Sequence, residues 1–211
     1  TEFGWSTAQI STALAIRFIL YGLLGPFAAA FMNYFGLRKV VVTALLLVVG
    51  GIVASLFMRD LWQLLLLWGV VIGTGTGMTA LVLGATVATR WFDKRRGLVV
   101  GLMTASNATG QLIFLPLLAV FAEGIGWRAA MVFITIALGV ALTLAFLFLR
   151  DRPSDLGLAP YGATEIVPAP IQSKRLMALV STPLMALRDA SRTSVFWVLF
   201  ATFFVCGLST G

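Results

Sequence analysis

The sequence predicts an all-α membrane protein that crosses the bilayer several times. Its 211 residues are 60% hydrophobic and 11% charged, whereas a soluble domain carries about 25% charged residues. The charges are clustered, and a helix needs about 20 apolar residues to cross a hydrocarbon core of about 30 Å. Charge-free runs of that order cover residues 40–58, 61–89, 97–122, 129–149 and 193–211. A sixth candidate, residues 7–31, contains one charge, Arg17.

The cations are distributed unevenly among the gaps between these runs. If each run crosses the membrane once, the gaps alternate between two sides of the membrane. Most cations fall on one side, and the other side holds only Arg59 and Arg128. Positive loops stay in the cytoplasm, so the net charge of +7 reflects topology rather than nucleic-acid binding. The cytoplasmic side then carries twelve of the fifteen cations: Arg38, Lys39, Arg90, Lys94, Arg95, Arg96, Arg150, Arg152, Lys174, Arg175, Arg188 and Arg192.

The first predicted helix begins after Ser6, because Ser6 and Gln9 form an S-x-x-Q capping box that satisfies N–H groups at a helix start. It runs to about residue 31, with Pro26 as an expected kink. A second proline, Pro116, lies in the fourth helix. The later helices of this bundle are expected over about 40–57, 62–89, 98–121 and 129–149.

A change of composition follows residue 149. Residues 150–193 are polar and Pro-rich, and within them Ser181-Thr182-Pro183 is expected to start a short amphipathic helix on the membrane surface. We divide the chain into an N-terminal transmembrane bundle (1–149), a cytoplasmic central loop (150–193) and the start of a C-terminal bundle (194–211). The chain lacks an initiator Met and ends inside an apolar run, so we expect a fragment truncated at both ends.

A shift of the chain by 90 residues reveals a weak internal repeat with six identities in 24 positions. The less common matches are Pro26 with Pro116, Gly36 with Gly126, and Arg38 with Arg128. One copy turns on the cytoplasmic side and the other turns outside. Inverted repeats of this kind are typical of secondary transporters; the alternative is chance similarity, since Ala and Phe matches are common in this composition.

Residue types that carry catalysis or hold metals are scarce. The chain has no His, and its single Cys206 excludes an internal disulfide. "GTGTGMTA" (73–80) imitates a dinucleotide fingerprint, but it lies inside a charge-free run, where close helix packing is the expected role. We therefore expect no cofactor, no metal and no enzyme. All eight acidic residues fall in predicted loops: Glu2, Asp60, Asp93, Glu123, Asp151, Asp155, Glu165 and Asp189.

Several stretches together resemble the major facilitator superfamily. They are "GPFAAAFMNYFGLRKV" (25–40), "RWFDKRRG" (90–97), "GWR" (126–128) and "RDRPSDLG" (150–157). "TEFGWSTAQIS" (1–11) is similar to the loop that enters span 2 in the monocarboxylate and oxalate–formate antiporter branch. The resemblance implies a helical bundle with inverted 3+3 repeats. In a protein of twelve spans, this chain would hold spans 2–6 and the start of span 7, without span 1.

The family's signature between spans 2 and 3 is retained in part. Gly36, Arg38 and Lys39 are present, whereas Asn33 stands where the family has an Asp and Tyr34 where it has an Arg. The resemblance implies that this turn helps to close the cytoplasmic gate. Asn33 can form hydrogen bonds but supplies no charge. The simplest role of the next cytoplasmic turn is to fix topology. Its alternative role is gating, for which the candidates are Asp93, Arg95 and Arg96.

Arg17 is the principal substrate-site candidate. It lies about ten residues into its helix, or roughly 15 Å at 1.5 Å per residue. A charge at that depth usually faces a cavity or a partner; the alternatives are snorkelling and pairing inside the bundle. Tyr21 lies one turn further on, and the 90-residue shift places Asn107 and Gln111 in the equivalent positions. These residues and Thr79 are expected to bind substrate, or alternatively to bond helix to helix.

These observations predict a secondary-active transporter that moves a small organic anion of the monocarboxylate type by alternating access. Arg17 would pair with the anion. A proton or a counter-substrate would couple transport, membrane lipids would surround the helices, and nucleic acid would not bind. We expect the bacterial inner membrane as the location. The alternatives are a non-transporting sensor on the same fold, which Asn33 keeps open, and a carrier of a non-anionic substrate.

Overall fold

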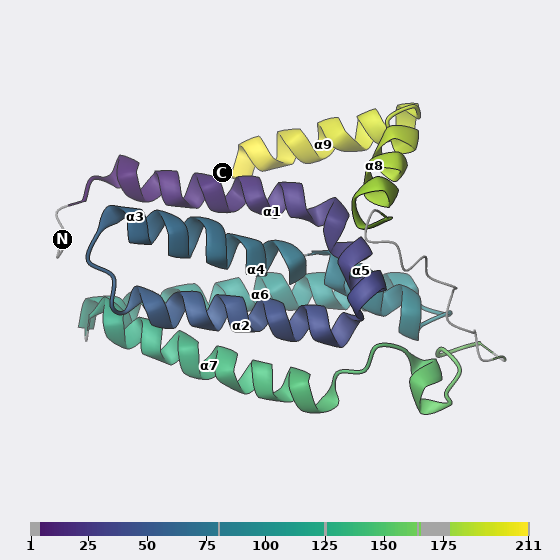
Figure 1. The fold of residues 1–211 in the computed structure, drawn as a ribbon, viewed down its shortest axis with the longest axis horizontal. Helices are drawn as coiled ribbons and strands as arrows, with labels where there is room; N and C mark the ends of the chain where they lie inside the picture. The colour runs from purple at the N-terminus through teal and green to yellow at the C-terminus, as the bar shows by residue number, and fades with distance from the viewer. Residues whose placement is uncertain (1–4, 80, 125, 164, 166–177, 211) are drawn as a thin grey trace. The chain divides into compact units, whose positions relative to one another are not determined.

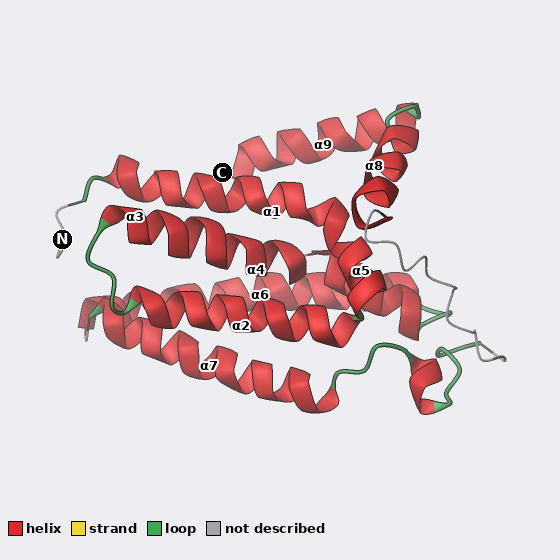
Figure 2. Cartoon of the chain, in the orientation of Figure 1, coloured by secondary structure: helices red, strands yellow, loops and turns green. Residues whose placement is uncertain are grey.

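The computed structural model describes residues 5–79, 81–124, 126–163, 165 and 178–210 (Figure 1). Regular secondary structure in these residues is helical apart from one isolated bridge (Figure 2). Five of the described helical segments are long and apolar enough to cross a membrane, or six if one bent pair is counted as a span. The predicted all-α membrane class is confirmed. The chain forms two compact units, residues 1–171 and 172–211, which are described separately.

The first unit begins with two long helices, α1 (Thr7–Phe35) and α2 (Leu37–Ser55). The predicted capping box is present, since Gln9 N donates to Ser6 Oγ at 3.3 Å and Ser6 N donates to Gln9 Oε1 at 2.9 Å. Pro26 lies inside α1 without ending it, and the helix continues past the expected limit near residue 31.

The third span consists of α3 (Leu61–Leu64), the π-helical segment η1 (Leu65–Val71), α4 (Ile72–Thr79) and α5 (Leu81–Trp91). The sequence predicted a plain α-helix over 62–89, so the π-helical turn is a difference from expectation. Wider π-helical turns are rare and insert a bulge into a helix.

Glycines let this third span approach both of its neighbours closely. A Cβ atom added to Gly73 would lie 3.2 Å from Arg17 Cα, and Gly69 and Gly77 also face α1. On the other side, a Cβ added to Gly75 would lie 2.8 Å from the backbone oxygen of Ala44 in α2. Small residues at helix contacts are typical of membrane bundles. The packing interpretation of residues 73–80 is confirmed for these glycines.

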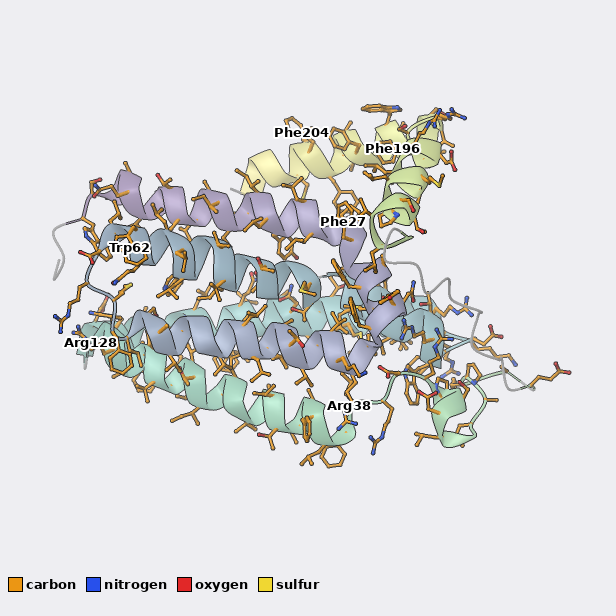
Figure 3. The ribbon with its side chains drawn as sticks, in the orientation of Figure 1. Phe27, Arg38, Trp62, Arg128, Phe196 and Phe204 are labelled. Atoms are coloured by element: carbon orange, nitrogen blue, oxygen red, sulfur yellow. The ribbon has the colours of Figure 1, made fainter. Side chains whose placement is uncertain are left out.

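The second pair of long helices repeats the first. α6 (Arg96–Gly124) is as long as α1, 29 residues, and contains Pro116 where α1 has Pro26. α7 (Trp127–Phe148) starts 90 residues after α2, behind Gly126, whose φ of 106° and ψ of 158° resemble the 94° and 148° of Gly36. Figure 3 shows Arg38 and Arg128 at opposite ends of the bundle. The two copies therefore have the same elements with their turns at opposite ends.

The best-buried apolar cluster lies at the end of the bundle that carries Arg38. Met32, Leu37, Val40 and Val41 form it, and side chains from α5 and α7 pack against it. Residues 150–162, hereafter the return segment, follow α7 at this end and include the 3₁₀ turn η2 (Pro153–Leu156). The first part of the predicted central loop therefore packs along this end of the bundle.

The second unit contains α8 (Ala178–Ala190) and α9 (Ser194–Thr210). A helix was predicted here, but its predicted start at Ser181-Thr182-Pro183 is wrong. The helix already runs from Ala178, and Pro183 lies inside it. The local sequence signal failed because a Pro, although favoured in the first turn, can also lie inside a helix, where it removes one backbone hydrogen bond. The predicted start of a further span near residue 194 agrees with α9.

Candidate functional site

At the Arg38 end of the bundle, the carboxylate of Asp151 caps the N-terminus of α2. The backbone N–H of Arg38 donates to Asp151 Oδ1 at 2.7 Å. The first N–H groups of a helix lack partners inside the helix, and they carry a partial positive charge. Gly36 makes the approach possible, because a Cβ at Gly36 would lie 2.8 Å from Asp151 Oδ2. The return segment thereby caps a helix 113 residues earlier in the chain.

The Arg38 side chain turns toward the end of α7. Its Nη2 donates to the backbone oxygen of Phe146 at 2.5 Å, and its guanidinium carbon lies 4.9 Å from the centre of the Phe146 ring. One residue therefore joins α2 to α7 by its side chain and to the return segment by its backbone. The next residue, Lys39, is exposed, and its side chain forms no hydrogen bond or ion pair with the described residues.

Arg90, in the last turn of α5, also forms contacts at the Arg38 end of the bundle. Its Nη2 donates to Asn33 Oδ1 at 2.7 Å and to the backbone oxygen of Met32 at 3.1 Å. Its Nη1 donates to the backbone oxygen of Asp151 at 3.2 Å. The neutral amide of Asn33 therefore accepts a charge-assisted hydrogen bond from a cation but supplies no counter-charge. Arg90 connects α1, α5 and the return segment.

The turn after α5 receives the far end of the return segment. Asp93 N and Lys94 N both donate to the backbone oxygen of Tyr161, at 2.9 and 3.2 Å, and Tyr161 N donates to the oxygen of Trp91 at 2.8 Å. The rings of Phe92 and Tyr161 lie 6.0 Å apart. These contacts hold the return segment across the ends of α2 and α5.

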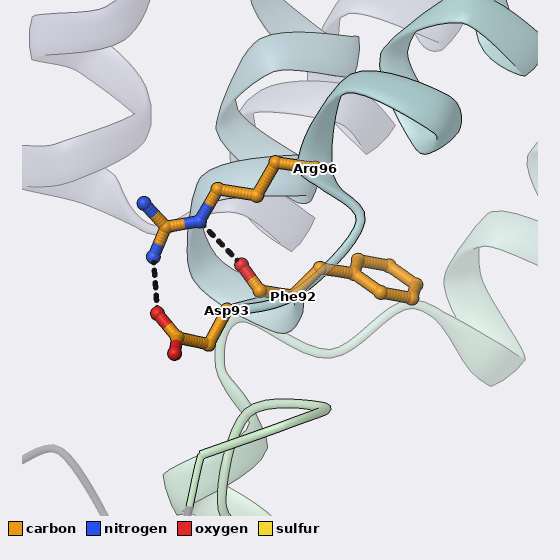
Figure 4. A network of polar contacts seen from close by, with 3 residues as sticks. All are labelled: Phe92, Asp93 and Arg96. Carbon is orange, nitrogen blue, oxygen red and sulfur yellow. Dashed lines mark hydrogen bonds and ion pairs between the residues drawn. The ribbon is translucent and has the colours of Figure 1, made fainter.

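The three gating candidates of this turn have local roles in the structure. Arg96 donates from Nη2 to Asp93 Oδ1 at 3.0 Å and from Nε to the backbone oxygen of Phe92 at 2.6 Å (Figure 4). Both charged side chains of this pair are about half exposed, at 51% and 52%. Arg95 adopts a left-handed backbone conformation with φ of 62°. The structure brings Asp93 and Arg96 together but does not join them to Asn33, Gly36 or Arg38.

In α1, Arg17 and Tyr21 lie one turn apart and are partly exposed. The backbone of Arg17 packs against Gly73 of α4. Within the described residues, no hydrogen bond or ion pair reaches either side chain. A guanidinium without a partner inside an apolar helix is available to bind an anion.

The remaining substrate-site candidates lie on other helices. Thr79 in α4 donates to the backbone oxygen of Gly75 at 3.1 Å, which leaves its oxygen lone pairs as acceptors. Asn107 and Gln111 are exposed on α6 and have no hydrogen bond to the rest of the described chain. α1 and α6 both pack on α5. Among the described residues, no side-chain hydrogen bond joins Arg17 or Tyr21 of α1 to Asn107 or Gln111 of α6.

Sequence reasoning did not select Asp151, Arg90 or Tyr161 as site residues. "RDRPSDLG" carried a signal, since Asp151 is an acid directly behind an apolar run. It did not reveal which helix start the acid would meet. A further unpredicted feature is Trp68 in η1, whose buried indole Nε1 has no acceptor in the described part of the chain. Within the described residues no cluster of His, Cys, Asp or Glu could hold a metal ion.

Comparison with known proteins places these features in a family. The sequence profile described as Major Facilitator Superfamily matches residues 1–211. The chain is 29% identical over 133 residues to monocarboxylate transporter 7 of Homo sapiens, covering 63% of this chain and 25% of that protein. It is 30% identical over 149 residues to monocarboxylate transporter 9 of Mus musculus, covering 69% and 28%.

A fungal relative extends the comparison. The MFS-type transporter hasB of Aspergillus fumigatus is 29% identical over 159 residues, covering 72% of this chain and 34% of that protein. The chain thus spans about a quarter to a third of the length of the curated relatives it matches. The names of these relatives describe transporters.

Proposed function

Because the chain belongs to the Major Facilitator Superfamily, we propose that it is part of a secondary-active transporter that moves a small organic anion of the monocarboxylate type. It is an integral, multi-pass membrane protein. Transport proceeds by alternating access, with the substrate site near the middle of the membrane at the interface between repeats. The protein is a carrier and not an enzyme, and its resemblance to named transporters supports this assignment.

Arg17 carries the substrate proposal. Its guanidinium lies in an apolar helix, and none of the described acidic residues pairs with it. A carboxylate on the substrate supplies the missing charge through a bidentate, charge-assisted contact. Tyr21, Thr79, Asn107 and Gln111 then provide hydrogen bonds that orient the substrate as the bundle closes around it.

The contacts at the Arg38 end support a gating role on the cytoplasmic side. Asp151, Arg90 and Asn33 tie the ends of α1, α2 and α5 to the return segment, which leads into the central loop. We propose that Gly36, Arg38, Lys39, Asp93, Arg95 and Arg96 act in this gate with them. Coupling is to a proton or a counter-substrate.

We also propose the bacterial inner membrane as the location, and the cation asymmetry supports an orientation with the Arg38 end in the cytoplasm. The relatives reported above come from two mammals and a fungus, and they support only the membrane.

Uptake of labelled small carboxylates into vesicles that contain the intact protein tests the proposal. Arg17→Gln should abolish carboxylate uptake in a protein that is still inserted and folded. The matched control is Arg59→Gln, which removes a cation from the turn between α2 and α3 and should leave uptake unchanged. Unchanged uptake in Arg17→Gln would make Arg17 structural. Binding without net flux by the unmodified protein would favour a sensor instead.

A further inference from the structure

The second unit contains a sharp corner between an apolar helix and an amphipathic one. The axes of Leu179–Ala190 and Ser194–Cys206 differ by 99°. α9 contains 17 residues with no charge, a length that crosses a thin bilayer core. If α9 crosses the membrane, a helix at a right angle to it lies in the plane of the membrane surface.

The sequence of α8 suits such a surface position. Leu179, Pro183 and Leu187 recur every four residues, and Val180 and Leu184 extend the same apolar face. The opposite face carries Met185 and four polar residues, Ser181, Thr182, Arg188 and Asp189. A helix with this division and flanking cations is typical of membrane interfaces, where its apolar side enters the acyl boundary.

An open, shallow groove of about 470 Å³ lies in the angle between the two helices. Its walls are mainly apolar and include Leu184, Leu187, Phe196 and Phe200. The rings of Phe196 and Phe200 are stacked with centres 6.2 Å apart, and Figure 3 shows Phe196 beside the corner with Phe204 further along α9. This wall offers a surface for a hydrocarbon chain.

Polar groups gather at the corner itself. Trp197 Nε1 donates to the backbone oxygen of Ser191 at 2.8 Å, which fixes the indole across the turn. Arg188 is the charged residue that lines the groove, and among the described residues it forms no ion pair. Trp is enriched at the level of lipid headgroups. The groove therefore has an apolar wall and, at its α8 side, a guanidinium that lacks a counter-charge.

We propose that this corner binds an anionic phospholipid of the cytoplasmic leaflet. The Arg188 guanidinium contacts the phosphate, and the acyl chain lies against Phe196 and Phe200. Charge complementarity favours an anionic occupant. Arg192 lies next to the corner, and Lys174 and Arg175 precede α8 in the sequence. The acidic residue near these cations in the sequence is Asp189. Basic residues beside a span attract anionic lipids, each by about fivefold in affinity. This site is independent of the substrate proposed for Arg17.

Native mass spectrometry of the intact protein tests the proposal, with retained phosphatidylglycerol compared with phosphatidylcholine. Arg188→Gln should lower phosphatidylglycerol retention about fivefold and leave phosphatidylcholine retention unchanged. Arg59→Gln is the matched control and should retain both lipids as before. Equal retention in Arg188→Gln and the control would overturn the proposal, as would displacement of the lipid by millimolar glycerol phosphate, which would indicate a soluble ligand.

The position of α8 is checked separately by spin labels in nanodiscs. The spin relaxation of a label at Leu187 should be accelerated mainly by lipid-soluble oxygen. The spin relaxation of a label at Ser181 should be accelerated mainly by a water-soluble nickel complex. Similar accessibility of both positions to water would show that α8 does not lie in the interface, and would contradict the lipid site even if the protein is folded.

Discussion

Replacing Gly36 with Ala should destabilise the protein far more than the same change at Gly126. The two glycines precede α2 and α7 and share a backbone conformation, with φ of 94° and 106°. That region is almost reserved for glycine, and another residue there costs about 1–3 kcal/mol. A Cβ at Gly126 would meet nothing within 4 Å, whereas a Cβ at Gly36 would lie 2.8 Å from Asp151 Oδ2.

The extra cost at Gly36 follows from the displaced carboxylate. Asp151 would have to leave the Arg38 N–H, and a hydrogen bond to a charged group contributes about 1.5–3 kcal/mol. Gly36→Ala should therefore lower the free energy of unfolding by about 2.5–6 kcal/mol. Gly126→Ala should lower it by only about 1–3 kcal/mol.

The assay is reversible unfolding of the intact protein in mixed micelles of mild detergent and SDS, followed by far-ultraviolet circular dichroism. A double-mutant cycle isolates the contact. In an Asp151→Ala background, Gly36→Ala should cost no more than Gly126→Ala does. Equal costs for the two glycine variants in the unmodified protein, or strict additivity of Gly36→Ala with Asp151→Ala, would refute the capping role of Asp151.

Three further perturbations probe other contacts by the same unfolding assay. Asn33→Ala removes one of the three oxygen acceptors of Arg90 and should lower stability by about 1–3 kcal/mol; an unchanged value would show that the bond from Arg90 to Asn33 contributes nothing. Gly75→Ala should lower the free energy of unfolding by about 1–3 kcal/mol, because its Cβ would meet a backbone oxygen of α2. Its control is Gly50→Ala, where a Cβ would meet nothing within 4 Å. This control should be neutral or raise the free energy of unfolding by up to about 1 kcal/mol. Arg96→Gln removes a half-exposed ion pair with Asp93 and one hydrogen bond to the backbone oxygen of Phe92, and it should lower stability by less than about 2 kcal/mol. A larger loss would show that this turn is coupled to the contacts of Asn33, Arg38 and Asp151.

Local signals in the sequence predicted most of the helices. Charge-free length predicted the spans, the Ser6 and Gln9 pair marked the start of α1, and glycine spacing predicted the close packing of α4. Each of these depends on a residue and its near neighbours along the chain. The class of the protein follows from such features because the bilayer imposes one length and one polarity on every span.

Contacts between distant segments were not predictable in the same way. Asp151 and Gly36 lie more than a hundred residues apart, and nothing in either stretch alone specifies that they meet. The π-helical turn around Trp68 likewise depends on how the third span fits between its neighbours. For Arg17, the sequence indicated a charge in an apolar helix. The structure adds that none of the described acidic residues forms an ion pair with it. The substrate-site grouping with Asn107 and Gln111 stays a prediction.

The most direct test of the central claim pairs a change in the substrate with a change in Arg17. Uptake of a small carboxylate and of its neutral amide is measured for the intact protein and for Arg17→Gln. If Arg17 binds the substrate charge, the unmodified protein should prefer the carboxylate by about 10- to 100-fold, the value of a charge-assisted hydrogen bond, and Arg17→Gln should lose that preference. The same preference in both proteins would contradict the account and place the anion elsewhere.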